Sequence, residues 1–193
     1  MNKTTNSAAA GKKPVSMTTK TLAYCALLAA LSVVMARLFG MMPNEYSRFS
    51  IEAVPTFIAG VLFGPVAGGL VGFVSDLVGC MFSGYAYNPM FCIPPILYGV
   101  CGGLFRMYLA KGVTLPRLLV SFLPPVVLGS ILWQSFALTY VYFKDGPFME
   151  GFLLRLGTRG IQFAVTLVLD VVIVHLLFKS KLFHRMGVWP PKK

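Results

Sequence analysis

The sequence predicts an all-α membrane protein with six transmembrane helices in a compact bundle. Of its 193 residues, 56% are hydrophobic and 12% are charged, and the mean hydropathy is +0.75. A soluble domain of this size needs more charge on its surface. Apolar stretches follow one another from about residue 21 to 179, with the charges gathered in the gaps, and a membrane span requires about 20 such residues.

The basic residues predict the orientation of the bundle. The net charge of +11 comes from clusters before the first stretch, in a central link and after the last stretch. Basic residues in these positions mark the cytoplasmic side, where they meet anionic lipid. Six spans put both termini on one side, so we expect both in the cytoplasm, a multi-pass protein of the cell membrane, and no nucleic-acid partner. The clusters are Lys3, Lys12, Lys13 and Lys20; Arg106, Lys111 and Arg117; Lys179, Lys181, Arg185, Lys192 and Lys193.

One membrane domain is expected over residues 19–180. It follows a disordered basic tail of residues 1–18 and precedes a basic cytoplasmic tail of residues 181–193. The first apolar run is too long for the core of a signal peptide, so we interpret it as a retained span.

The first three spans are expected at about 21–39, 51–63 and 66–82, with a link at 40–49. The second is short, so either it begins inside the link or it is a partial span packed against protein. Gly64-Pro65 separates it from the third. Glycines at 60, 64, 68 and 72 predict close backbone packing, within the chain rather than at a dimer interface.

The last three spans are expected at about 90–109, 118–143 and 151–178. Pro94-Pro95 and Pro124-Pro125 should kink the first two of these. The cysteines have no metal-ligand spacing, and we interpret them as buried thiols, although two of them, Cys80 and Cys92, could meet near the outer face. We expect neither a metal nor a cofactor.

Polar residues at the second and third spans are candidates for a binding site. Arg48 and Glu52 lie four residues apart and share a face if that segment is helical. Asp76 lies within the third span, where an ionisable group costs several kcal/mol unless it is paired. The alternative is a structural ion pair between Asp76 and Arg48.

The last span carries a polar stripe. Its five members recur at intervals that place them on one helical face, which must point into the bundle. Two arginines at its outer end offer planar forks of donors for a carboxylate, or they reach the membrane interface with internal hydrogen bonds below them. The members are Arg155, Arg159, Gln162, Thr166 and Asp170.

Aromatic and amide side chains gather toward the outer face. Tyr87, Asn88, Phe91 and Trp133 suit a planar heterocycle, and they also suit the aromatic belt of a membrane interface. The sequence contains no phosphate-binding loop of the G-x-x-x-x-G-K-[ST] type, no HExxH and no GxSxG. It therefore predicts a binder or carrier rather than an enzyme.

Four short motifs occur in order in the stretch from Arg48 to Arg106. They are Arg48-Phe49-Ser50 with Pro55, Gly64-Pro65, Asp76-Leu77-Val78-Gly79 and Tyr87-Asn88-Pro89. An Arg-x-Ser ahead of a proline, a Gly-Pro break, an Asp-x-x-Gly and a Tyr-x-Pro form a family pattern, and with it this stretch resembles the substrate-binding S component of energy-coupling factor vitamin transporters, most closely the folate-specific family.

The resemblance implies a six-helix protein that binds a vitamin from outside, with folate preferred. It implies docking onto a transmembrane coupling subunit with two cytoplasmic ATPases. An Ala-x-x-x-Ala pair on the first helix contacts the coupling subunit in the family, and Ala26 and Ala30 match it. The arginine of Arg-x-Ser lines the substrate pocket in the folate family and corresponds to Arg48.

Two departures bear on the substrate. Met90-Phe91-Cys92 stands where folate members usually have Gly-Phe-Thr, and Glu52 stands where an apolar or aromatic residue is common. Other vitamin-like heterocycles, such as a queuosine precursor or pantothenate, therefore stay open as ligands. A small intramembrane enzyme using Asp76 or Asp170, and a channel or solitary ion-coupled carrier, are the alternatives from other classes.

Overall fold

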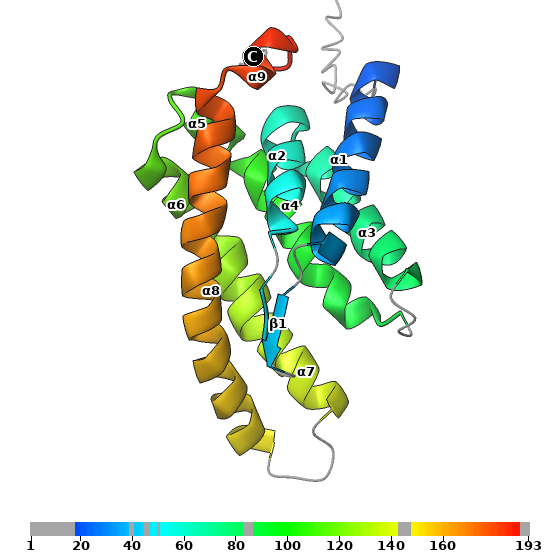
Figure 1. Ribbon diagram of the computed structural model, residues 1–193, viewed down its shortest axis with the longest axis vertical. Coiled ribbons are helices and arrows are strands. Elements are labelled where there is room, and N and C mark those ends of the chain that lie inside the picture. The colour runs from blue at the N-terminus through cyan, green and yellow to red at the C-terminus, as the bar shows by residue number, and fades with distance from the viewer. Residues whose placement is uncertain are drawn as a thin grey trace, which may run out of the picture.

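The computed structural model describes residues 18–38, 41–44, 47–49, 51–82, 87–142 and 148–189. Three of its helical stretches are long and apolar enough to cross a membrane: α1 (Thr19–Leu38), the stretch Leu115–Val141, and α8 (Phe148–Lys179). Shorter apolar helices occupy Ala53–Phe63, Pro65–Met81 and Pro89–Leu104. The predicted helical architecture is confirmed, and the start of α1 and the C-terminal segment lie at the same end of the bundle (Figure 1).

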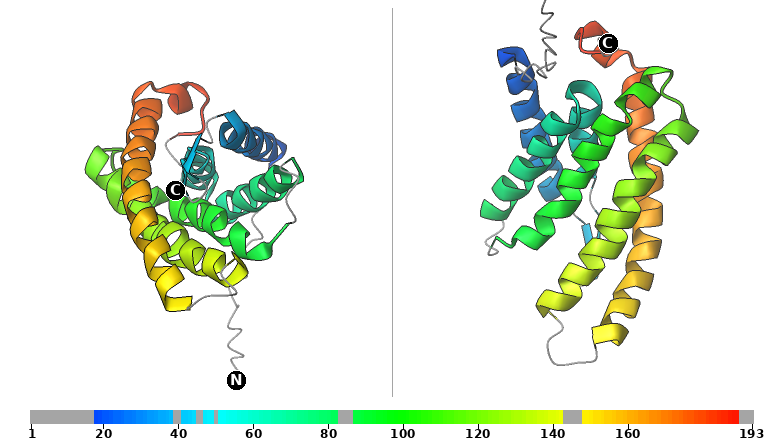
Figure 2. Two further views of the ribbon diagram at one scale, coloured as in Figure 1. Left: turned by 60° about the horizontal axis from the view of Figure 1, so that its bottom comes forward. Right: turned by 180° about the vertical axis from the view of Figure 1, so that it is seen from behind.

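The predicted link after α1 contains a small β-hairpin, so the fold is not purely α-helical. β1 (Met41–Asn44) and β2 (Ser47–Phe49) are antiparallel, with Met41 opposite Phe49 and Asn44 opposite Ser47. The hairpin lies inside the ring of helices rather than outside it (Figure 2, left). β2 is a neighbour of α8, so the residues between α1 and α2 reach into the bundle.

Helix α2 (Ala53–Phe63) has 11 residues and a length of about 16 Å, roughly half of the 30 Å hydrocarbon core. Every residue from Val54 to Leu62 is buried, and the other spans surround the helix (Figure 2). The partial span packed against protein is therefore confirmed. It ends at Gly64, whose φ of 100° suits glycine, and α3 (Pro65–Met81) begins with a proline that needs no N–H there.

Glycines bring α2, α3 and α4 (Ile93–Leu104) into backbone contact. A Cβ on Gly60 or on Gly68 would overlap the carbonyl oxygen of Gly99, and a Cβ on Gly72 would lie 2.6 Å from the carbonyl carbon of Pro95. The predicted close packing of these glycines within the chain is confirmed. Small residues permit this approach in lipid, where van der Waals packing drives helix association.

The fourth span does not kink at its proline pair, which corrects our expectation. It begins as the 3-10 helix η1 (Pro89–Cys92), and Pro94 and Pro95 lie in the first turn of α4. The amides of a first turn have no helical partner, so prolines cost little there. The span breaks instead at Phe105, before α5 (Arg106–Ala110).

The fifth span changes its helix type at its proline pair. α6 (Leu115–Pro124) leads into η2 (Pro125–Trp133), a π-helix of 9 residues, and α7 (Gln134–Tyr142) follows. Two successive prolines remove two amide donors, so the backbone in this region cannot keep the ordinary α-helical bonds. π-Helical turns are rare and often lie at functional sites.

The C-terminal segment folds back on the end of α8. Beyond the short helix α9 (Leu182–Arg185), Trp189 is buried, and its ring centroid lies 5.1 Å from that of Phe178. The ring centroid of Phe183 lies 4.8 Å from that of Phe178, so the three rings pack together. Part of the predicted basic tail is thus packed onto the bundle.

Candidate functional site

Three carboxylates from separate elements lie within electrostatic range of the start of α2. Glu52 precedes α2 and is half-buried. It interacts electrostatically with Asp76 on α3 and with Asp170 on α8. Its backbone oxygen accepts hydrogen bonds from Ser32 Oγ at 2.8 Å and from Thr56 Oγ1 at 3.4 Å, so α1 and α2 together fix this position.

Two of these carboxylates carry buried oxygens available to a ligand. Oδ2 of Asp76 and both carboxylate oxygens of Asp170 are buried and accept no hydrogen bond from the described residues. Asp76 is half-buried, and Asp170 is 1% exposed. A buried polar atom without a partner is rare in native proteins, and an intramembrane carboxylate is a functional candidate by default.

The polar stripe of α8 faces the interior, as its spacing predicted. Gln162, Thr166 and Asp170 are all buried, and Thr166 Oγ1 donates to the backbone oxygen of Gln162 at 3.1 Å. Arg155 and Arg159 continue the stripe toward the outer end and are half-buried. The guanidinium of Arg159 lies 5.9 Å from the centroid of the Phe163 ring, a distance at which a cation is attracted to an aromatic face.

Arg48 belongs to the hairpin, and the structure describes only its backbone. It lies in β2, beside α8. The predicted pairing of its side chain with Asp76 lies outside the described part of the chain.

Three of the predicted residues lie at or against the segment before α4. Asn88 Oδ1 accepts from the backbone N–H of Met90 at 3.0 Å, and Trp133 Nε1 donates to the backbone oxygen of Met90 at 2.8 Å. Phe91, the next residue in the sequence, is half-buried. Trp133 therefore makes an internal bond to η1, in addition to any role in an aromatic belt.

Tyr87 lies at the outer edge of this group and is 39% exposed. The interaction of its hydroxyl with the Cys92 thiol is the largest effect on Tyr87 and, together with burial, raises its pKa to about 12. Tyr87 therefore keeps its proton at physiological pH and stays a donor.

Sequence reasoning missed two interior groups. Tyr98 is 5% exposed, and its hydroxyl lies 3.0 Å from Ser130 Oγ on η2. Cys92, interpreted as a buried thiol, lies within electrostatic reach of both Asp76 and Tyr87. The pairs Tyr98–Ser130 and Cys92–Asp76 have no signal in sequence spacing, because their partners come from different spans. In the described residues, no group of three or more His, Cys, Asp and Glu side chains could hold a metal ion.

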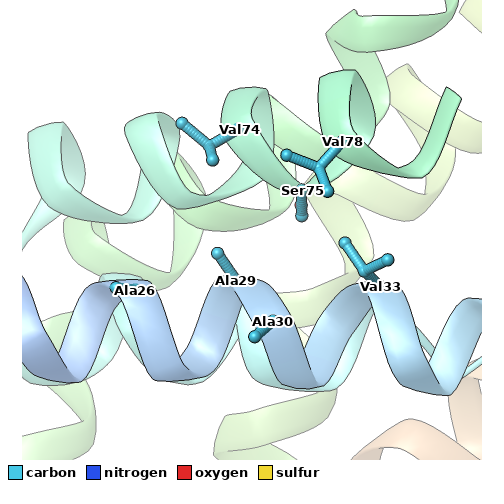
Figure 3. A pocket seen from close by; sticks show the side chains of 7 residues that line it. All are labelled: Ala26, Ala29, Ala30, Val33, Val74, Ser75 and Val78. Carbon is cyan, nitrogen blue, oxygen red and sulfur yellow. The ribbon is translucent and has the colours of Figure 1, made fainter. Parts of the chain in front are cut away.

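Ala26 and Ala30 are on α1, at the edge of the bundle, and border an apolar hollow of about 210 Å³ between α1 and α3. Figure 3 shows the side chains of Ala29, Val33 and Val78 directed into the space between the two helices. Ala26 and Ala30 are themselves exposed. Its lining residues are Ala26, Ala29, Ala30, Val33, Val74, Ser75 and Val78.

The model of a family described as "ECF-type riboflavin transporter, S component" matches residues 16–179. The chain belongs to this family of S components. It is a multi-pass protein of the cell membrane and a transporter subunit rather than an enzyme.

Individual relatives of this S component include folate transporters. The folate transporter FolT of Clostridium novyi (strain NT) is 31% identical over 99 residues, which cover 51% of this chain and 56% of that protein. The aligned part is thus about half the length of the curated relative. A crystal structure of FolT bound with folic acid has a TM-score of 0.71 at 25% identity, covering 84% of this chain and 95% of that chain.

A second solved structure is similar in fold alone. ThiT from Listeria monocytogenes has a TM-score of 0.62 at 16% identity, with 83% of this chain and 94% of that chain covered. The predicted resemblance to S components is confirmed by the family match and by the FolT similarity.

Proposed function

We propose that this S component is the high-affinity substrate-binding subunit of an energy-coupling factor transporter that takes up folate from outside the cell. ATP hydrolysis comes from partner subunits, a transmembrane coupling subunit and two cytoplasmic ATPases. The observation that carries the folate assignment is the similarity to FolT bound with folic acid over most of both chains. The C. novyi folate transporter supports the same ligand over half its length.

The proposed topology has six spans with both termini in the cytoplasm. The helical segments are α1, α2, α3, the η1–α4 span, the α6–η2–α7 span and α8. The basic residues at the end shared by α1 and α9 support this orientation, because positive charge collects on the cytoplasmic side. The open end of the site, with Tyr87 and Arg155, then faces outward.

The chemistry of folate suits the two kinds of charge in the site. A pterin ring presents N–H donors along one edge, and a buried carboxylate such as Asp76 accepts them. The glutamyl tail carries two carboxylates, which Arg155 and Arg159 neutralise at the outer end of α8. Arg48 and Glu52 complete the proposed pocket with Tyr87, Asn88, Phe91, Trp133 and Gln162.

The apolar hollow on α1 is the proposed contact with the coupling subunit. Ala26 and Ala30 are exposed on α1 and leave room for the backbone of an incoming helix, and the hollow beside them is apolar. Substrate binding and coupling therefore use different faces of the bundle.

The ligand can be identified directly. The full chain is purified from cells grown in rich medium, and the small molecule that accompanies it is identified by mass spectrometry. Folate supports the proposal. A different ligand would contradict folate as the substrate and still agree with the transporter assignment. Such ligands are riboflavin, which the family's description names, a queuosine precursor and pantothenate.

The arginines provide the second test. Arg48→Ala and Arg159→Gln each lose a charged contact worth about 2 kcal/mol, so folate binding should weaken about 30-fold in calorimetric titration. Arg117→Gln is the matched control, because Arg117 lies at the cytoplasmic end, where its Nη1 donates to the backbone oxygen of Gly112 at 3.0 Å. Unchanged affinity in both site variants argues against this pocket.

A further inference from the structure

The start of the fourth span is held from two sides by close helix contacts. On one side Gly72 of α3 meets the backbone of Pro95, where a Cβ would lie 2.6 Å from the carbonyl carbon. On the other side Gly129 of η2 meets Pro94, where a Cβ would lie 3.3 Å from Cα. A side chain at Gly72 would push the backbone of α4 aside, and one at Gly129 would need its neighbours to shift slightly, so the first turn of α4 packs closely against both helices.

One helical turn beyond each contact, a polar side chain reaches η1. Asp76 follows Gly72 by four residues and meets Cys92, which precedes Pro95 by three. Trp133 follows Gly129 by four residues and donates to the backbone oxygen of Met90. The antiparallel course of α3 and α4 (Figure 2, right) thus brings Asp76 and Cys92 together because Gly72 and Pro95 touch.

Cys92 connects two groups from different segments of the chain. The Asp76 carboxylate and the Tyr87 hydroxyl are the polar side chains that act on its thiol. Cys92 is 3% exposed, so its thiol is largely shielded from water, and weak sulfur hydrogen bonds matter most where water is excluded. One oxygen of the carboxylate, Oδ2, accepts nothing from the described residues and is buried.

We propose that Cys92 is a positioning residue for ligand recognition, which orients the Asp76 carboxylate so that Oδ2 accepts an N–H donor of the bound heterocycle, and ties Tyr87 across the outer edge of the same site. This inference rests on the proposed function and assigns Cys92 a role in that site. It predicts selectivity for ligands with an N–H donor edge, such as a 2-aminopyrimidinone, over rings that present only acceptors there. A serine retains both hydrogen bonds, whereas an alanine retains neither.

Calorimetric titration of the purified full chain with folate tests the role in binding. Cys92→Ala should weaken folate binding about tenfold, and Cys92→Ser should stay within about twofold of the wild type, because one recovered charge-assisted bond is worth about 1.4 kcal/mol. Cys101→Ala is the matched control, since it removes another buried thiol of the same span and should leave the affinity unchanged. If Cys92 acts through the carboxylate, Cys92→Ala in an Asp76→Asn background should cause no further loss.

Three titration results overturn the inference: wild-type affinity in Cys92→Ala, equal losses in Cys92→Ala and Cys92→Ser, or a loss that adds in full to that of Asp76→Asn. Infrared spectroscopy of the ligand-free protein supplies a readout that needs no folate. The S–H stretching band assigned by Cys92→Ala should move to higher frequency in Asp76→Asn, because an amide accepts more weakly than a carboxylate, and an unmoved band also overturns the inference. A wild-type protein that binds no folate contradicts the proposed substrate, and the infrared result then decides the pairing by itself.

Discussion

The glycine contact between α3 and α4 gives a stability prediction that can be worked out from the structure. In Gly99→Ala the new Cβ would overlap the carbonyl group of Gly68 and lie 2.9 Å from the amide nitrogen of Gly69. These atoms are backbone, so no side chain can rotate away and the two helices must separate. Separation also disturbs Gly60, which packs against the carbonyl of Gly99.

The expected cost lies at the upper end of what overpacked cores show. Inserting a methyl group into a tightly packed core costs about 1–3 kcal/mol, and we take about 3 kcal/mol because the clash is with backbone. For a chain of this length each kcal/mol shifts Tm by about 2–4 °C. Gly99→Ala should therefore lower Tm by about 6–12 °C.

A thiol-reactive fluorescent dye in detergent measures this directly, because Cys25, Cys92 and Cys101 are buried and react only as the protein unfolds. Gly157→Ala is the matched control, since nothing lies within 4 Å of the position that its Cβ would take. Alanine is about 0.5–1 kcal/mol better than glycine within a helix, so this variant should raise Tm slightly. A Gly99→Ala protein as stable as the wild type, or two variants that shift Tm alike, would refute the packing described above.

Three other predictions concern single contacts. Trp133→Phe loses the 2.8 Å hydrogen bond to the backbone oxygen of Met90, worth about 1 kcal/mol, and should weaken folate binding about fivefold in calorimetric titration. Trp189→Phe at the cytoplasmic end is the control and should bind folate like the wild type. Equal affinities of the two variants would show that η1 does not contribute to folate binding. Tyr98→Phe removes the hydrogen bond to Ser130 and should lower Tm by about 2–4 °C in the dye assay. Adding Ser130→Ala should lower Tm little further, and fully additive losses of Tm would contradict the pairing. Ala30→Leu fills the hollow on α1 and should abolish folate uptake by cells that carry the partner subunits, while the purified protein still binds folate. Uptake at the wild-type rate would show that this face of α1 is not the docking surface.

The span pattern could be predicted because each boundary has a local cause. Gly64-Pro65 ends one helix and starts the next through their own backbone preferences, and the stripe from Gln162 to Asp170 faces inward because lipid rejects polar side chains. The glycine spacing likewise predicted close packing before the neighbour, Gly99, was known. In each case the residues that carry the signal are close in the sequence.

Features that depend on contacts between distant segments could not be predicted. The hairpin strands have four and three residues and no alternating pattern, so only their place among the helices stabilises them. The proline pairs have the same sequence and different outcomes, because Pro94-Pro95 begin a helix whereas Pro124-Pro125 lie inside a span. Cys92 meets Asp76 only because Gly72 and Pro95 touch, and no spacing within either segment encodes that meeting.

The π-helix of the fifth span has a consequence for how related chains are aligned. A π-turn contains more residues than an α-turn, so the number of residues between Pro125 and Trp133 sets the angle at which α7 emerges. Deleting one of them would leave the hydropathy profile almost unaltered while turning α7 about its own axis by about 100°. Trp133 would then point away from Met90. Two chains of this family can therefore have apolar segments of similar length and composition while different side chains face the interior.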